Sequence, residues 1–331
     1  MMDNEKVKIR IKLSSIIRRW EFTIFGLLIV IFIINVILSP ELFRIHNLLD
    51  ATLTFTEKSI MVLPMTLLII SGVIDISVGS ISAMSGVILG VCFKAGIGIW
   101  YAAVIGIFVG LVAGFINGLI ITKLKIPSIV VTLAMMLFYR GIGYILLGDS
   151  AVRDLPEKFG ILGGAYSITF IPIQFLIFIV LAVIFGVLLH TTTFGRRIYI
   201  IGNNENTARY SGLPVDRTRL VLTAVMGFVS GLSGVLLTSR IGSARPDIAM
   251  GTEMTVITIA LLGGVYIFGG RGTILGVVIS AFILGYIHYG LSILNIQEQV
   301  IRIATGGVLI IALLIPTFVE KIREKAFERS R

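Results

Sequence analysis

The hydrophobic residues of this chain fall into ten runs of about 15 to 24 residues, separated by short polar stretches. Most runs are near the roughly 20 residues that an α-helix needs to cross the hydrocarbon core of a bilayer, although three are short. The pattern therefore predicts an all-α polytopic membrane protein with about ten transmembrane helices, folded as a single domain over residues 1–331. The predicted spans are residues 22–38, 58–74, 81–96, 99–122, 127–147, 169–190, 218–238, 252–268, 273–292 and 298–317.

Composition agrees with this class. Hydrophobic residues make up 56% of the 331 residues and charged residues 14%. A soluble domain has about 45–50% hydrophobic residues and about 25% charged residues. The lone Cys92 lies inside an apolar run, so neither a disulfide framework nor a cysteine-based metal site is predicted. His46, His190 and His288 have no ligand-like spacing, and no metal site is predicted from them either.

The basic residues are unevenly distributed over the loops. With a cytoplasmic N-terminus, 19 of the 28 Lys and Arg residues fall on the cytoplasmic side, as the positive-inside rule expects. This prediction places residues 1–21, the central loop 191–217 and residues 318–331 in the cytoplasm. Asp247 and Glu253 are predicted in an outer loop, and Arg140 is interpreted as reaching the outer membrane edge. The same distribution accounts for the formal charge of +10, so no nucleic-acid partner is expected. The cytoplasmic cations are six before residue 20, Lys123 and Lys125, five within 191–219, Arg271, and five after residue 317.

The first apolar run follows a basic segment, which is also the pattern of a cleaved signal peptide. The run is long for such a peptide, however, and no A-x-A cleavage site follows it, since Ser39-Pro40-Glu41 comes next. We therefore interpret residues 22–38 as the first transmembrane helix.

The central loop contains the pattern of one short helix. Asn203 or Asn204 can cap its start, Glu205 places an acid in its first turn, Gly212 can take the left-handed position after its end, and Pro214 stops it. A helix of about two turns is not stable alone in water. It must therefore pack on its own membrane domain or on a partner.

Three residues near the end of this helix are candidates for contact with such a partner. Ala208 is small enough to enter a pocket, and Tyr210 can bury its ring while its hydroxyl stays wet. Leu213 follows them. We interpret the segment as the contact through which another protein drives the chain.

Glycines recur every fourth residue at Gly106, Gly110, Gly114 and Gly118, along one face of a helix. Such a face lets another helix approach closely in lipid. Tight packing within the bundle is one interpretation, and lining of a transport pathway is the other.

Two apolar regions are interrupted by glycines, at Gly72–Ser80 and at Gly263–Thr273. Short, glycine-broken apolar segments in matching halves of a chain are typical of transport pathways. The backbone can leave the helix there only where protein or water satisfies its polar groups. The spacing hints at an internal duplication, whose halves can be parallel or inverted.

Asp75 is interpreted as the only acid within the apolar stretches of the first half. At the bilayer centre an acid costs about 2.5–3.5 kcal/mol on insertion scales, so it should face a cavity, a helix N-terminus or a hydroxyl. It can cap the third helix at the cytoplasmic edge or contact substrate. The predicted substrate pathway comprises Asp75, Ser77, Gly79, Ser80 and Asn117.

No G-x-x-x-x-G-K-[ST] motif occurs, so the chain has no phosphate-binding loop and no cofactor of its own is predicted. No Ser-His-Asp set lies plausibly on one face, and enzyme activity is not expected.

These motifs together resemble the permease subunits of ribose-type ATP-binding-cassette importers, a group that handles pentoses, galactose, rhamnose and autoinducer-2. The resemblance extends from about residue 40 to residue 317 and is strongest to the autoinducer-2 or rhamnose type. One departure is Val73, where most relatives carry a second glycine. The motifs are Gly72–Ser80, Asn117 with Gly118, Ile126–Leu133, Glu205–Gly212, Ser243–Glu253 and Leu262–Gly272.

The resemblance implies a permease in the bacterial inner membrane that pairs with an identical or sister permease. It also implies two cytoplasmic ATPases, which bind ATP and Mg²⁺, and an extracytoplasmic substrate-binding protein that delivers a sugar. Transport would follow alternating access, with coupling to the ATPase through Glu205, Ala208, Tyr210 and Gly212.

The alternative is an ion-coupled secondary transporter with broken helices, which needs no ATPase. Such carriers usually keep several intramembrane acids or histidines for the coupling ion. Asp75 nearly alone is a poor supply of these groups.

Overall fold

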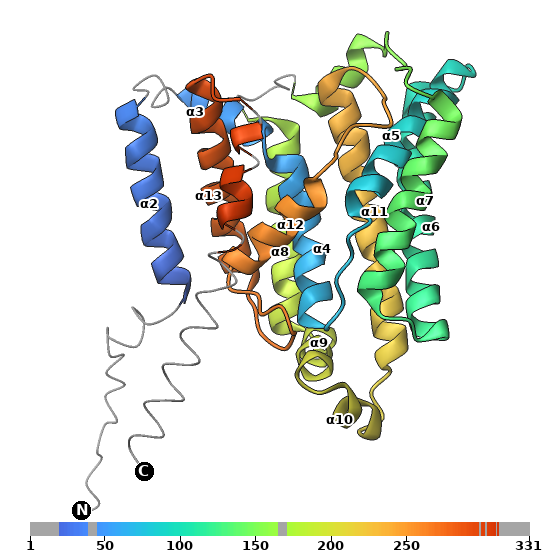
Figure 1. Ribbon diagram of the computed structural model, residues 1–331, viewed down its shortest axis with the longest axis vertical. Helices are drawn as coiled ribbons and strands as arrows, with labels where there is room; N and C mark the ends of the chain where they lie inside the picture. Colours follow the sequence, from blue (N-terminus) through green and yellow to red (C-terminus); the bar gives the residue numbers. More distant parts are fainter. Residues whose placement is uncertain are drawn as a thin grey trace, which may run out of the picture.

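The computed structural model describes residues 20–38, 45–164, 171–297, 299–301, 303–308 and 310. These residues are mostly helical, and Val152 and Ala244 form the one β-bridge recorded among them. Figure 1 shows the long helices side by side, with α9 (Thr193–Asn203) and α10 (Glu205–Tyr210) beyond one end of the bundle. We call this end the α10 end.

Six described helices are long and apolar enough to cross a membrane, or seven if the bent pair formed by α3 (Ile45–Leu53) and α4 (Thr56–Ile70) is one span. The prediction of an all-α polytopic membrane protein is confirmed, but the count of ten spans is not. Half of the tenth predicted span, including residues 311–317, lies outside the described residues. The six helices are α2 (Trp20–Leu38), α6 (Ile99–Leu124), α7 (Ser128–Leu147), α8 (Ile173–Thr191), α11 (Val215–Ile241) and α13 (Ile274–Ile293).

Two predicted spans, 81–96 and 252–268, are instead the shorter helices α5 (Val78–Lys94) and α12 (Thr252–Leu262). The 11 residues of α12 rise only about 16 Å, too little to cross a bilayer. Each helix begins inside the bundle after a non-helical stretch (Figure 1). The stretch before α5 is part of the predicted Gly72–Ser80 break. The stretch before α12, residues 242–251, was predicted as an outer loop.

The glycine face of α6 packs against α5 and α11. A methyl group added at Gly110 would lie 2.6 Å from the carbonyl oxygen of Gly227, and one at Gly106 would lie 2.7 Å from that of Ser85. Because these neighbours are backbone atoms, they cannot move aside as the end of a flexible side chain could. The interpretation as tight helix packing is therefore confirmed.

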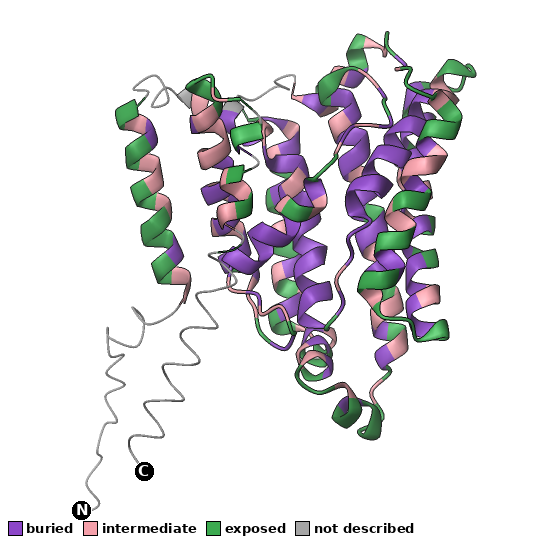
Figure 2. Cartoon of the chain, in the orientation of Figure 1, coloured by how far each residue is buried: buried purple, intermediate pink, exposed green. Residues whose placement is uncertain are grey.

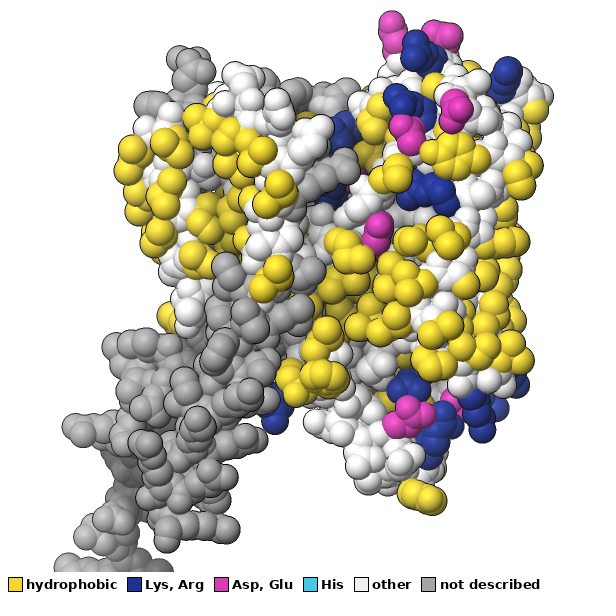
Figure 3. Space-filling model, viewed as in Figure 1, with side chains coloured by type: hydrophobic (Ala, Val, Ile, Leu, Met, Phe, Trp, Pro, Cys, Tyr) yellow, Lys and Arg dark blue, Asp and Glu magenta, His cyan; other side chains and the backbone are white. Residues whose placement is uncertain are grey.

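Burial follows the expected membrane pattern (Figure 2). Helix α4 is buried along nearly its whole length, whereas α2, α6, α7 and α8 expose large apolar side chains such as Ile37, Val104 and Ile145. Such faces suit contact with lipid tails. In Figure 3 hydrophobic side chains occupy the middle of the molecule, and most of the visible charged side chains lie toward its two ends.

Candidate functional site

The short helix of the central loop is present as α10, with the predicted ends. The Asn204 side chain caps it by accepting a hydrogen bond from the Thr207 backbone N–H at 3.0 Å. Glu205 lies in its first turn, and Gly212 follows it with φ +75°. Pro214 then precedes α11. The capping chemistry read from the sequence is thus confirmed.

The preceding helix, α9, was not predicted. Its Ile198 and Ile201 side chains are buried, and with Phe194 they have the helical spacing that could have indicated it. The Tyr199 hydroxyl donates to the Gly272 carbonyl at 2.7 Å. Gly202 lies directly against the Ile70 carbonyl. Helix α9 is therefore fixed to the ends of other segments at the α10 end.

Helix α10 presents its candidate contact residues in different ways. Ala208 is fully buried in a small cluster with Ile201 and Val215, so it cannot enter a partner's pocket, and its prediction as a docking group is corrected. Its small side chain instead lets α10 pack closely on α9 and α11. Tyr210 is 93% exposed at the tip of the helix and is free to contact a partner. Leu213 is half-buried beside the same cluster.

Glu205, Arg209, Asp216 and Arg219 form what we call the α10 ion-pair network. Arg209 donates to Glu205 at 2.9 Å and to Asp216 Oδ2 at 3.0 Å. Arg219 pairs with the other oxygen of Glu205 at 2.8 Å and donates to the Ser71 carbonyl at 3.1 Å. The network therefore joins α10 to α11 and to the first residue after α4.

The network shifts the acidity of its members. Partial burial would raise the pKa of Glu205, but the hydrogen bonds and charges of Arg209 and Arg219 outweigh it, so that pKa lies below its usual value. Hydrogen bonds to Asp216 and Glu205 raise the pKa of Arg209. Glu205 and Arg209 are therefore charged at neutral pH.

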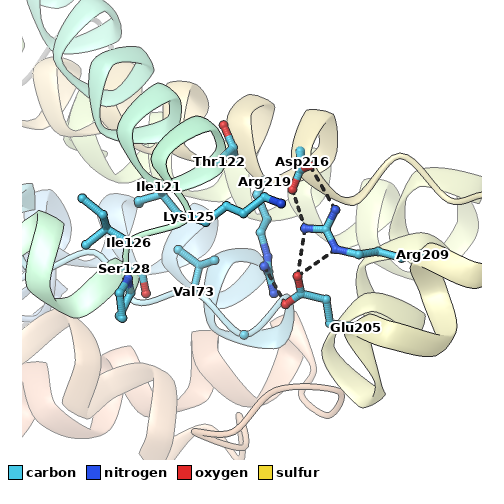
Figure 4. Close-up of a pocket in the computed structure, with 12 residues that line it drawn as sticks. Val73, Ile121, Thr122, Lys125, Ile126, Ser128, Glu205, Arg209, Asp216 and Arg219 are labelled. Carbon is cyan, nitrogen blue, oxygen red and sulfur yellow. Dashed lines mark hydrogen bonds and ion pairs between the residues drawn. The ribbon is translucent and has the colours of Figure 1, made fainter.

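A pocket of about 470 Å³ separates this network from the start of α7 (Figure 4). The Lys125 side chain points from the end of α6 toward the network, and Val73 lies on the opposite side. The pocket's other described lining residues are Gly72, Ile121, Thr122, Ile126, Pro127 and Ser128.

Four side chains form a buried cluster beside the start of α5, which we call the Asp75 cluster. One oxygen of Asp75 accepts from the Ser77 N–H at 2.8 Å and from its hydroxyl at 2.6 Å. The Asn117 amide donates to the Ser77 hydroxyl at 2.8 Å, and the Tyr139 hydroxyl donates to Asn117 at 2.9 Å. Asp75 thus holds the turn before α5 in the fully buried interior, but it does not cap the helix, whose N-cap is Ser77 with no side-chain cap bond, so the capping interpretation is corrected.

The remaining predicted pathway residues lie in the first turn of α5. Gly79 is adjacent to the Ala249 carbonyl and the Glu253 carboxylate, and Ser80 is fully buried. Asp75, Ser77 and Asn117 are thus hydrogen-bonded together, whereas the Ser80 hydroxyl has no hydrogen-bond partner among the described residues. Glu253 was predicted in an outer loop but belongs to the first turn of α12. The starts of the two short helices therefore meet.

Sequence reasoning missed several polar contacts. Tyr139 lies in the predicted α7 span but gave no local signal of its bond to Asn117. Glu57, just before the predicted 58–74 run, is also buried within the bundle and pairs with Arg240 of α11. Arg140, interpreted as reaching the outer edge, donates to the carbonyls of Pro246 and Ile248 at 2.6 and 2.7 Å.

No group of three or more His, Cys, Asp or Glu residues suited to a metal ion occurs within the described ranges. The arrangement offers instead two mechanical features. One is a rigid exposed helix at the α10 end. The other is a buried non-helical stretch that Arg219 joins to it.

Comparisons with known proteins identify a transport family. Residues 47–314 match the family described as "Branched-chain amino acid transport system / permease component". The chain is 34% identical over 301 residues to the autoinducer 2 import system permease protein LsrD of Yersinia enterocolitica serotype O:8 / biotype 1B, covering 89% of this chain and 91% of the relative. It is 32% identical to LsrD of Escherichia coli O9:H4 (strain HS), covering 89% and 91%. These matches confirm the resemblance to permeases of the autoinducer-2 type.

A solved structure shares the fold. PsaBC from Streptococcus pneumoniae in complex with Fab superimposes with a TM-score of 0.52 over 84% of this chain and 95% of that chain, at 18% identity. The polytopic helical architecture, the family match and the relatives agree. The chain therefore belongs to the family of transport-system permease components and is the membrane-spanning subunit of an import system.

Proposed function

We propose that this permease forms the translocation pathway of an ATP-driven importer for a sugar-like small molecule. A cytoplasmic ATPase, which binds ATP and Mg²⁺, docks at the α10 end. An extracytoplasmic substrate-binding protein delivers the cargo, and a second permease, identical or related, completes the pathway. The sugar-like substrate rests on the relatives, which are named as autoinducer 2 import permeases.

The observation that carries ATPase coupling is the form of α10. Its Tyr210 is 93% exposed, yet the helix beneath it is held by a cap, by buried Ala208 and by the α10 ion-pair network. A large aromatic group on a rigid support loses little conformational entropy when it binds, and this is typical of an interaction hot spot.

The α10 ion-pair network also provides a route by which a displacement of α10 can reach the interior of the bundle. A displacement of α10 acts on Arg219 through Glu205, and Arg219 is bonded to the Ser71 carbonyl. Residues 71–77 lead from there to the Asp75 cluster and the start of α5. We propose that ATP binding reshapes the interior along this route and thereby drives alternating access.

The test is Tyr210→Arg, measured by pull-down of the ATPase that co-purifies with the wild-type chain. We expect ATPase retention and uptake in proteoliposomes to fall at least about tenfold, since loss of an aromatic hot spot costs about 2 kcal/mol or more. Tyr101→Arg is the matched control because Tyr101 is 75% exposed on α6, away from α10. Normal retention by Tyr210→Arg would contradict the docking assignment.

Transport by the purified permease without any ATPase would instead support the ion-coupled alternative. A proton or sodium gradient must then drive uptake in proteoliposomes. Under the proposed function, uptake requires ATP and is indifferent to either gradient.

A further inference from the structure

A second pocket, of about 330 Å³, lies among α4, α12, α13 and the helical residues 299–301 and 303–308. Lys58, in the first turn of α4, lines it, whereas the far end of α4 reaches α9. His288, near the end of α13, also lines it. The pocket therefore lies in the half of the bundle away from α10. We call it the α12 pocket.

Its lining is rich in hydroxyl groups for a site inside a membrane domain. Thr252, Thr255 and Thr258 follow one another at three-residue intervals on α12, and Thr305 joins them. Three-residue spacing places side chains on one face of a helix. A hydroxyl can donate one hydrogen bond and accept two. This face can therefore either donate a hydrogen bond to a cargo hydroxyl or accept one from it.

The individual hydroxyls leave capacity for a ligand. Thr258 donates to the Met254 carbonyl at 2.7 Å, which leaves its oxygen able to accept. The Thr255 hydroxyl lies 3.4 Å from the Gly251 carbonyl. This hydrogen bond is long and therefore weak, so the hydroxyl can rotate toward a ligand instead.

The charges of the lining also discriminate between cargo classes. Lys58 and His288 line the pocket, but no Asp or Glu is among its described lining residues. An amino acid, whose class gives the family its description, carries an ammonium group that needs a carboxylate or a set of acceptors when taken out of water. An uncharged polyhydroxylated molecule needs only hydrogen-bonding partners.

A small cavity of about 30 Å³ adjoins the pocket and shares Lys58, Thr255 and His288 with it. Its lining also includes the apolar Phe55, Ile259 and Leu284. The apolar side chains there form a floor that leaves no room for a sugar.

Resting on the proposed importer function, we propose that the α12 pocket is the transit site at which an uncharged polyhydroxylated cargo binds between delivery and release. Its wall begins at Gly251 and Thr252. The next residue, Glu253, does not line the pocket; its side chain lies against Gly79 at the start of α5. The route from α10 through residues 71–77 thus ends at this wall, where movement can open the floor.

The test uses the permease reconstituted with its ATPase and binding protein, and measures ATP-driven uptake of labelled D-ribose, L-rhamnose, autoinducer-2 and L-leucine. We expect wild type to transport a hydroxylated member of this panel and not L-leucine. Thr255→Trp, which fills the pocket, should lower that uptake at least about tenfold because close-packed walls leave no second route. ATPase activity should persist, and Val104→Trp on the exposed face of α6 should transport normally.

A milder pair isolates the hydroxyl chemistry. Thr258→Val should lower the maximal uptake rate about two- to tenfold, as expected for loss of one hydrogen bond. Thr66→Val removes the same kind of back-bonded hydroxyl, 2.8 Å from the Val62 carbonyl, but outside the pocket, and should change uptake less than about twofold. Wild-type uptake by Thr255→Trp, or uptake of L-leucine alone, would overturn the proposal.

A substrate-independent measurement separates this proposal from the importer function. In a Cys92→Ala background, Thr255→Cys should react with a water-soluble thiosulfonate at least about tenfold faster than Val104→Cys, because lipid excludes the reagent from the latter. If no panel member is transported, the substrate class fails while this labelling still tests the pocket. An unreactive Thr255→Cys would show that the pocket is not a water-filled transit site.

Discussion

The two glycine-interrupted stretches, Gly72–Ser80 and Gly263–Thr273, each follow a helix that ends near the α10 end, but they take different courses. The first leaves α4 and enters the bundle as non-helical chain until α5 begins at Val78. The second stays beside α9 and leads into α13 at Ile274 (Figure 1). They meet where the Gly270 N–H donates to the Ile70 carbonyl at 2.8 Å.

The difference follows from the polar groups available to each backbone. Along the first stretch, Ile74 donates to the Ser128 hydroxyl at 3.3 Å, Arg219 reaches Ser71, and Asp75 accepts from Ser77. Side chains thus satisfy a non-helical backbone inside the membrane domain, where water cannot.

The second stretch relies on glycine and on backbone contacts. Gly264, Gly269, Gly270 and Gly272 all have positive φ, and the chain turns back within a few residues against α9. Positive-φ glycines, with a hydrogen bond from the Tyr199 hydroxyl to the Gly272 carbonyl, therefore support a turn at the edge. Entry into the bundle requires side chains from other helices, and this makes the first stretch the one suited to transmit movement.

The largest expected effect comes from Gly202, which lies between the two stretches. A methyl group there would overlap the Ile70 carbonyl and lie 2.5 Å from the Gly270 nitrogen. Because both neighbours are backbone, we expect Gly202→Ala to separate α9 from both stretches, to lower the midpoint of thermal unfolding by about 5–10 °C, and to abolish uptake.

The control is Gly186→Ala in α8, where the nearest neighbour of the new methyl is a side-chain atom 3.9 Å away. Its midpoint should stay within about 2 °C of wild type or rise, since alanine favours the helix. Normal stability of Gly202→Ala, measured by fluorescence-detected size exclusion after heating, would contradict the close attachment of α9.

The second prediction concerns Asp75 of the first stretch, because the second stretch contains no acidic residue. Asp75→Leu leaves the Ser77 N–H and hydroxyl without their acceptor, whereas Asp75→Asn keeps an acceptor oxygen. We expect initial uptake rates to fall at least about tenfold for Leu and about two- to fivefold for Asn, with membrane insertion intact for both. Asp247→Asn is the control, because the Asp247 side chain is half-exposed and pairs with Arg245 outside the Asp75 cluster. Wild-type uptake by Asp75→Leu would remove Asp75 from the pathway.

Local chemistry made much of α10 and α6 predictable from the sequence. Asn204, Glu205 and Gly212 act within a few residues of one another, so capping rules suffice. The four-residue glycine repeat identifies a packing face for the same reason. The predicted grouping of Asp75 with Ser77 also needed only two residues of separation.

The remaining contacts depend on which helices become neighbours. Arg219 and Ser71 are 148 residues apart, and Arg240 and Glu57 are 183 apart. No periodicity in a single helix pairs such residues. Asp247 and Glu253 were assigned to an outer loop because Pro246 and Asp247 are typical of loops locally. Arg140 from α7 instead holds the connection before α12 in the structure by donating to the carbonyls of Pro246 and Ile248.

The third prediction tests whether Arg219 by itself links α10 to the first glycine-interrupted stretch. Its guanidinium contacts Glu205 and Ser71 at once, which the single ammonium of lysine cannot reproduce. We expect Arg219→Lys to lower uptake about three- to tenfold while ATPase activity persists. Arg217→Lys, two residues away and exposed, should behave as wild type. Equal effects of the two variants would reduce the role of Arg219 to general charge.

The smallest expected effect is a pH dependence of the same network. The pKa of Glu205 in the folded protein is lowered by Arg209 and Arg219, so the network stabilises the fold fully above the unfolded pKa of about 4.3 and loses this contribution as pH falls through the folded value. Because the network is partly exposed, its contribution is at most about 1 kcal/mol. Wild type should therefore unfold a few degrees above Glu205→Gln at pH 5 to 8, by roughly 2–4 °C, and the gap should close only below about pH 4. A gap that closes between pH 6 and 7 would mean that another group, and not Glu205, controls the attachment of α10 to the first stretch.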